Sequence, residues 1–274
     1  MLIVYLFGIS SSLELAIYGH EFVPNESASF LSFANQLKTE SGLVETNLAD
    51  GNTDLAKEHA TRAVELVSSK DPVNNVTWKE EIAEKNQRVA DDLVAAISGL
   101  ANMNISSSSV SSKVTNQSVS DIYAIIDEAI TSRIDKEQRD NATVQATALG
   151  DTVNALLGYY GDAFSVGFDM GNMSQMATGM EGASSNKNYS LVNVTDYQSS
   201  QALAKMTLEI FDNDLNGLAS TNRTDSVSKL EVGLHQLNDS IDNKSSPIEV
   251  MTIGHTQVHP NLQAAFNLKL QMMM

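Results

Sequence analysis

Four methionines lie close together in a glycine-rich segment of the chain. They follow the pattern M-x2-M-x2-M-x3-M and are Met170, Met173, Met176 and Met180. Thioether sulfur is a soft, uncharged ligand that favours Cu(I) and needs no deprotonation. On a helix this spacing would form an apolar stripe, but the interspersed glycines disfavour a stable helix. The pattern therefore indicates a copper-binding loop, and packing of the methionines within a loop is the alternative.

Two of the five histidines stand four residues apart near the C-terminus. On a helix, His255 and His259 would place both imidazoles on one face, as a metal-binding pair requires. His255 falls on a core position of the local apolar pattern, where a polar ring needs a hydrogen bond or a metal. Pro260 has no backbone N–H, so the helix should bend at this point. The spacing indicates a metal site, and a hydrogen-bonded core histidine beside a bend is the alternative.

Two further histidines, His59 and His235, lie beside apolar residues of other expected helices. Each could be a metal ligand, but hydrogen bonding or contact with solvent is the favoured interpretation of either residue alone. The segment 212–217 matches the first six positions of a calcium-binding loop, yet Arg223 stands where that loop needs a bidentate glutamate. We therefore expect a helix there, and no calcium site.

The N-terminal residues match part of a secretory signal peptide. Leu2–Ile9 is an apolar run that is too short to span a bilayer. Cleavage after Gly19 would remove residues 1–19 as a signal peptide and make His20 the mature N-terminus. The α-amine and imidazole of His20 could then chelate Cu(II) as a histidine brace, with one histidine of the C-terminal pair as the third nitrogen ligand. The alternative is a buried first helix or strand of a cytoplasmic protein.

Acceptor sites for N-glycosylation point to the same compartment. The N-x-[ST] pattern occurs eleven times, whereas the 23 asparagines and 49 serines and threonines predict about four occurrences by chance. The eleven acceptors are Asn25, Asn75, Asn104, Asn116, Asn141, Asn172, Asn188, Asn193, Asn222, Asn238 and Asn243. We therefore expect N-linked glycans on a secreted protein, and an unmodified surface rich in Asn, Ser and Thr is the alternative.

The composition excludes several classes of protein. The 274 residues include no cysteine, which excludes disulfides, zinc fingers, iron–sulfur clusters and a cysteine nucleophile. The net charge of −17 repels phosphate backbones and argues against nucleic acid as a partner. The sequence also lacks G-x-S-x-G, P-loop, G-x-G-x-x-G and H-E-x-x-H motifs, so no catalytic residue is predicted.

Apolar residues recur at intervals of three and four, which predicts an all-α fold. We expect an elongated bundle of about six or seven antiparallel amphipathic helices and no transmembrane span. Residues 20–101 are predicted to form a three-helix subdomain, followed by a Ser-rich linker at 102–118. Residues 119–274 are predicted to form a C-terminal helical bundle that contains a Gly/Met-rich loop at 165–195.

Part of the chain resembles known groups of proteins. The stretch GHEFVPNESASFLSFANQLKTESGLVETNLADGNTDLAKEHATRAVEL resembles the start of uncharacterised secreted helical-bundle proteins of ammonia-oxidising archaea. This resemblance implies an archaeal source with N-glycosylation, heavy copper use and an extracellular location. Within it, AKEHATRA is similar to the A-x-x-H-A rhythm of small periplasmic metal-binding proteins, and this portion includes His59. The dense histidine repeats of that second group are not present in this sequence.

Together these features predict a secreted, non-enzymatic protein, extracellular or associated with the cell surface, that binds a metal ion, with copper as the expected metal. One alternative is a structural or interaction module of the cell surface, which binds a cell-envelope protein partner and no metal. A third interpretation is a copper oxidase or monooxygenase built on His20 as the N-terminal residue.

Overall fold

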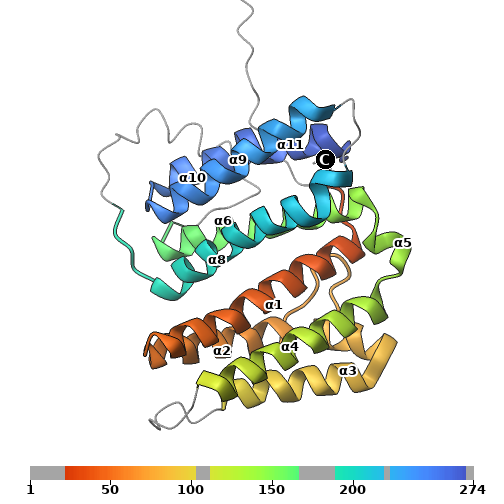
Figure 1. The fold of residues 1–274 in the computed structure, drawn as a ribbon, viewed down its shortest axis with the longest axis vertical. Coiled ribbons are helices and arrows are strands. Elements are labelled where there is room, and N and C mark those ends of the chain that lie inside the picture. Colours follow the sequence, from red (N-terminus) through yellow and green to blue (C-terminus); the bar gives the residue numbers. More distant parts are fainter. Residues whose placement is uncertain (1–21, 103–111, 167–188, 219–222, 270–274) are drawn as a thin grey trace, which may run out of the picture. The chain divides into compact units, whose positions relative to one another are not determined.

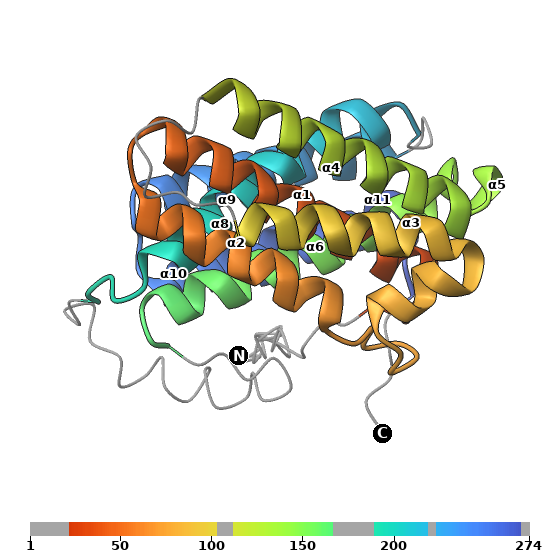
Figure 2. The ribbon, with the colours of Figure 1, turned by 90° about the horizontal axis from the view of Figure 1, so that it is seen from below.

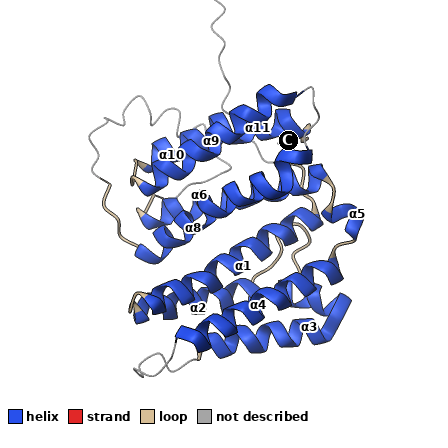
Figure 3. Ribbon diagram, viewed as in Figure 1, coloured by secondary structure: helices blue, strands red, loops and turns tan. Residues whose placement is uncertain are grey.

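The computed structural model describes residues 22–102, 112–166, 189–218 and 223–269. In these ranges the chain forms helices and no strand, apart from one isolated β-bridge between Lys70 and Thr77 (Figure 1, Figure 3). The predicted all-α class is therefore confirmed. None of the helices in these ranges is both long enough and apolar enough to cross a membrane.

The described helices are more numerous than predicted. The first six are α1 (Glu26–Ala49), α2 (Thr53–Ser68), α3 (Trp78–Ala101), α4 (Ser112–Arg133), α5 (Lys136–Arg139) and α6 (Ala142–Ala163). The remaining α-helices are α8 (Val194–Ile210), α9 (Thr224–Asp242), α10 (Pro247–Ile253) and α11 (His259–Phe266). Two π-helical turns, Phe211–Leu215 and Gly254–Val258, follow α8 and α10. The prediction of six or seven was too low because it missed the short α5 and treated the last helical region as one element.

The first four helices share one hydrophobic core. Phe33 of α1 stacks on Trp78 of α3 with ring centroids 4.6 Å apart, and Phe30 lies edge-on to the same tryptophan at 5.9 Å. Ile122 of α4 is buried in the same cluster. The sequence analysis grouped α4 with the C-terminal bundle and part of the linker, but α4 begins at Ser112 and packs on α1 and α3 (Figure 2). Apolar periodicity identifies the buried face of a helix but not the neighbour that covers it.

The opposite face of α1 is polar and is also covered by helices. Here α6 and α8 pack on α1, and α9, α10 and α11 pack on α6 or α8 (Figure 1). The buried side chains that α1 contributes include Ser32, Glu40 and Asn47. Ser32 Oγ, for example, accepts a hydrogen bond from Thr152 Oγ1 of α6 at 3.3 Å. Because α1 is enclosed in this way, its polar side chains must find partners inside the protein.

A close contact between α1 and α4 can be tested by substitution. A Cβ at Gly42 would lie 2.6 Å from Tyr123 Oη, which donates a hydrogen bond to Lys38 O at 3.1 Å. We expect the helix-propensity gain of Gly42→Ala, up to about 1 kcal/mol, to be offset by a loss of about 1–3 kcal/mol in the free energy of unfolding, measured in urea, because Tyr123 must move and lose this bond.

The matched control for this substitution is Gly158→Ala in α6. Nothing lies within 4 Å of the Cβ position of Gly158, and alanine favours a helix over glycine by up to about 1 kcal/mol. This variant should be as stable as the wild-type protein or more stable. Equal stabilisation by both substitutions would contradict the close packing of α1 on α4.

Candidate functional site

The predicted histidine pair lies inside the protein at the junction of α10 and α11. His255 is 4% exposed and His259 is 1% exposed, so both imidazoles are withdrawn from solvent. Their ring centroids are 5.0 Å apart and their ring planes are inclined by 77°. The residues between them form a π-helical turn in which the His259 N–H donates to Gly254 O. Pro260 follows without an N–H, which accounts for the irregular helix that the sequence predicts at this point.

The segment that precedes α1 lies against this histidine pair. The Phe22 ring is edge-on to His259, with ring centroids 5.7 Å apart. Phe22 fits there because Gly150 of α6 has no side chain: a Cβ on Gly150 would lie 2.6 Å from Phe22 Cε2. The Val23 N–H donates to Lys269 O at 2.9 Å. The two ends of the described chain therefore run side by side near α11.

The other predicted ligands cannot be placed beside this pair. Five of the predicted ligands lie outside the described residues: His20, Met170, Met173, Met176 and Met180. Across the part of the chain that the structure describes, no group of three or more His, Cys, Asp or Glu side chains is arranged to hold a metal ion. Of the predicted ligands that fall within this part, the structure brings together His255 and His259.

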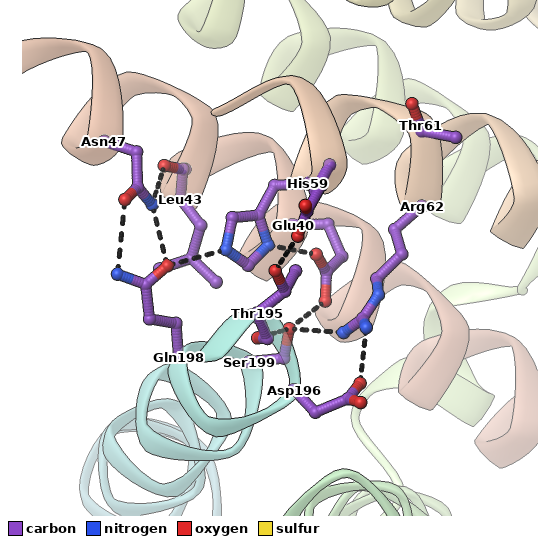
Figure 4. Close-up of polar contacts among 12 residues, drawn as sticks. Glu40, Leu43, Asn47, His59, Thr61, Arg62, Thr195, Asp196, Gln198 and Ser199 are labelled. Carbon is purple, nitrogen blue, oxygen red and sulfur yellow. Dashed lines mark hydrogen bonds and ion pairs between the residues drawn. The ribbon is translucent and has the colours of Figure 1, made fainter. Parts of the chain in front are cut away.

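A second histidine site lies between α1, α2 and α8 (Figure 4). His59 of α2 is 0% exposed, and its Nδ1 lies 2.7 Å from Glu40 Oε2 of α1. Its Nε2 lies 2.9 Å from Gln198 Oε1 of α8. Ser199 Oγ donates to Glu40 Oε1 at 2.6 Å, and Gln198 Nε2 donates to Asn47 Oδ1 at 3.2 Å. Figure 4 shows these side chains meeting from three helices, and we call them, with Arg62 and Asp196, the His59 network.

The hydrogen bonds determine where the protons of His59 lie. Asn47 Nδ2 donates to Leu43 O at 2.9 Å, and it also donates to Gln198 Oε1 at 3.0 Å. Because Gln198 Oε1 is an acceptor in this arrangement, His59 Nε2 must be the donor to it. A second proton lies between His59 Nδ1 and Glu40 Oε2. Both ring nitrogens are therefore engaged, and neither is available to a metal ion.

Arg62 of α2 completes the His59 network. Its Nη1 donates to Ser199 Oγ at 3.1 Å, and its Nη2 pairs with the Asp196 carboxylate of α8. Burial raises the pKa of Asp196, and the Arg62 guanidinium opposes that rise. Arg62 also lies 5.3 Å from the centroid of the Tyr159 ring, and burial, reinforced by Glu40, raises the pKa of that phenol. The proton between His59 and Glu40 leaves that pair without net charge, and Arg62 balances Asp196, so the network can hold three helices together without net charge.

Sequence reasoning missed the partners of His59 because they are distant in the chain. Glu40 lies 19 residues from His59, and Gln198 lies 139 residues from it. No local spacing connects such positions. The available signal was the row of alanines at Ala56, Ala60 and Ala63, all buried, which marks the covered face of α2 next to His59.

The predicted glycan acceptors that the structure describes lie mostly at helix ends and connections. Asn25, Asn141 and Asn193 are the N-caps of α1, α6 and α8, and the side chain of each accepts a backbone N–H. Asn75 and Asn243 are exposed in connections between helices. Asn238 lies within α9, and the side chain of Asn116 is not described. Four further acceptors lie outside the described residues: Asn104, Asn172, Asn188 and Asn222. A glycan joins the side-chain nitrogen, so capping through Oδ1 is compatible with modification.

Comparisons with protein-family profiles, with curated proteins and with solved structures found no match. Function must therefore be inferred from the chemistry and geometry of the residues themselves.

Truncation of His59 tests the His59 network. We expect His59→Ala to lower the free energy of unfolding by about 3–5 kcal/mol, because buried Glu40 would lose its partner in the pair. The matched control is His235→Ala, since His235 is exposed on α9 and its loss should change stability by no more than about 0.5 kcal/mol. Urea unfolding compares the two variants, and equal effects would contradict the paired state of His59.

Proposed function

We propose that this chain is a secreted, non-enzymatic protein that binds copper, with His255 and His259 as its central metal ligands. The observation that carries the proposal is the distance of 5.0 Å between the two ring centroids. A metal about 2 Å from one nitrogen of each ring, with a near-tetrahedral angle between the bonds, sets the centroids about 5 Å apart. The helix already holds the rings at the spacing that a shared ion requires, and imidazole is a ligand that suits copper.

In this proposal His20 supplies a third nitrogen ligand, with its α-amine, in the mature protein. The contact between Phe22 and His259 supports this assignment, because a stretch of two residues spans at most about 7 Å. The methionines at 170–180 supply a separate, softer set of ligands for Cu(I). The protein is proposed to lie outside the cell or on its surface with N-linked glycans, and the exposed acceptors Asn75, Asn141 and Asn243 support that part.

A structural or interaction module of the cell surface is the second candidate function. The 77° inclination of the two imidazole planes favours it, because edge-on packing of two buried aromatic rings needs no metal ion. In this alternative the histidines are packing residues, and the protein binds a cell-envelope protein partner in place of copper.

Titration with Cu(II) separates the two candidate functions. We expect the mature protein to bind Cu(II) in calorimetry, and His255→Ala and His259→Ala each to weaken binding by more than about tenfold, since loss of even an outer-shell partner has that effect. Removal of the exposed His235 in His235→Ala should leave the affinity unchanged. Circular dichroism verifies that each variant is folded. If neither His255→Ala nor His259→Ala alters the affinity for Cu(II), the result would support the structural or interaction module.

Glycopeptide mass spectrometry tests the proposed compartment. In protein isolated from its natural host, we expect glycans on the exposed side chains of Asn75, Asn141 and Asn243. Asn238 is the internal control, because its Oδ1 is buried within α9 and its acceptor sequence lies in a helix. Three unmodified exposed acceptors would contradict the secreted, glycosylated state.

A further inference from the structure

The connection between α2 and α3 folds around the backbone of one buried aspartate. The Asp71 N–H donates to Val76 O, and Asp71 O accepts the Asn75 N–H, both at 2.8 Å. The Trp78 N–H donates to Ser69 O at 3.1 Å and closes the base of the connection. Asn75 adopts the left-handed conformation at φ 63°, which completes this tight turn. The carboxyl group of Asp71 is thereby held inside the protein.

Two carboxyl groups meet beneath this connection. Asp71 is 0% exposed and Glu81 of α3 is 3% exposed, and their side chains are within hydrogen-bonding reach of each other. Asp71 Oδ1 accepts from Ser29 Oγ at 2.8 Å and from the Val73 N–H at 3.0 Å. Asp71 Oδ2 is buried and accepts no hydrogen bond from any donor in the described residues. One carboxyl oxygen of the pair therefore lacks a donor.

Arg133 is the cation that pairs with Glu81. Arg133 of α4 donates to Glu81 Oε2 through Nε at 3.0 Å and through Nη2 at 2.8 Å. Asn74 Nδ2 donates to Glu81 Oε1 at 2.6 Å. Arg133 also faces Glu26 of α1 at 3.5 Å, but Glu26 is largely exposed to solvent. Among the described residues Arg133 pairs with Glu81, and no cation forms an ion pair with Asp71, so one negative charge is not balanced if both buried acids are ionised.

One shared proton would account for both the missing hydrogen-bond donor and the unbalanced negative charge. On either acid it removes the excess negative charge, and it supplies the O–H donor that a pair of facing carboxyl oxygens requires. We propose that Asp71 and Glu81 share one proton at neutral pH in a carboxylic acid–carboxylate hydrogen bond, and that release of this proton to solvent loosens the α2–α3 connection from α1 and α4. This pair is independent of the proposed copper site and gives the fold a pH-sensitive latch.

The direction of the pH dependence follows from the same contacts. Burial is the main cause that raises the pKa of Glu81 above its ordinary value of 4.5, Asp71 adds to the rise, and Asn74 and Arg133 oppose it. The folded protein therefore holds a proton that the unfolded chain releases. The stabilisation is complete below pH 4.5 and is lost as the pH rises through the folded pKa of Glu81.

Asp71→Asn tests the latch. Asparagine retains an oxygen for Ser29 and Val73 and supplies a permanent N–H donor in place of the shared proton. In the wild-type protein, the unfolding constant should rise by up to about tenfold per pH unit as the pH approaches the folded pKa of Glu81, because the unfolded chain has already released its proton. Asp71→Asn should remove this contribution. The matched control is Asp91→Asn on the exposed face of α3, which should keep the wild-type pH profile. Urea unfolding at a series of pH values measures all three proteins.

Three further measurements keep the proposal testable if Asp71→Asn fails to fold. Glu81→Gln removes the titrating pair from the other side and should flatten the same part of the profile. In the wild-type protein, carbon NMR of the carboxyl groups should show one proton shared by Asp71 and Glu81 at neutral pH. Amide exchange at Asp71, Asn75 and Trp78 should accelerate as this signal titrates. A wild-type slope retained in Asp71→Asn, or two fully ionised carboxylates at neutral pH, would overturn the proposal.

Discussion

The burial of polar side chains on α1 is the constraint on which the rest of the structure depends. This helix packs on α4 and part of α2 through aromatic and aliphatic residues, and its hydroxyl, amide and carboxyl groups meet α6, α8 and His59 of α2. A buried polar group without a partner costs about 1–3 kcal/mol, so each one has to be matched across a helix interface. The partners come from α2, α6 and α8 for this face of α1. Since the chain has no cysteine, such pairing and the apolar core must hold the fold together without disulfides.

This constraint separates the chemistry of the two histidine sites. Both ring nitrogens of His59 form hydrogen bonds to neighbouring helices, so its role is to join α1, α2 and α8. His255 and His259 instead lie on one helical segment, at a π-helical turn that sets their rings 5.0 Å apart. Irregular turns of this kind occur frequently at functional sites in helical proteins. The same residue type therefore joins helices in one place and is proposed to bind a metal ion in the other.

Charge is balanced differently in the two buried polar clusters. In the His59 network the proton between His59 and Glu40, together with Arg62, balances the two carboxyl groups, which removes any need for a further proton or ion. Around Asp71 and Glu81 one guanidinium pairs with Glu81 and no cation pairs with Asp71, and this difference of one charge is the basis of the proposed sensitivity to pH. A protein with a net charge of −17 has few cations to distribute, and the structure places Arg62 and Arg133 where buried carboxylates need them. The remaining acids can stay at the surface, where water solvates them.

The sequence by itself determined the all-α class, the presence of three helices within residues 20–101 and the irregularity before Pro260, because these follow from local periodicity and backbone chemistry. It also identified His255 and His259 as neighbours, since a spacing of four residues on a helix brings two side chains together. Only the tertiary structure decided that α4 joins α1 and α3 and that Glu40 and Gln198 complete the site of His59. A helix that is buried on two sides carries polar residues that resemble a solvated face in the sequence. Their partners lie up to 139 residues away, and packing, which no local pattern encodes, brings them together.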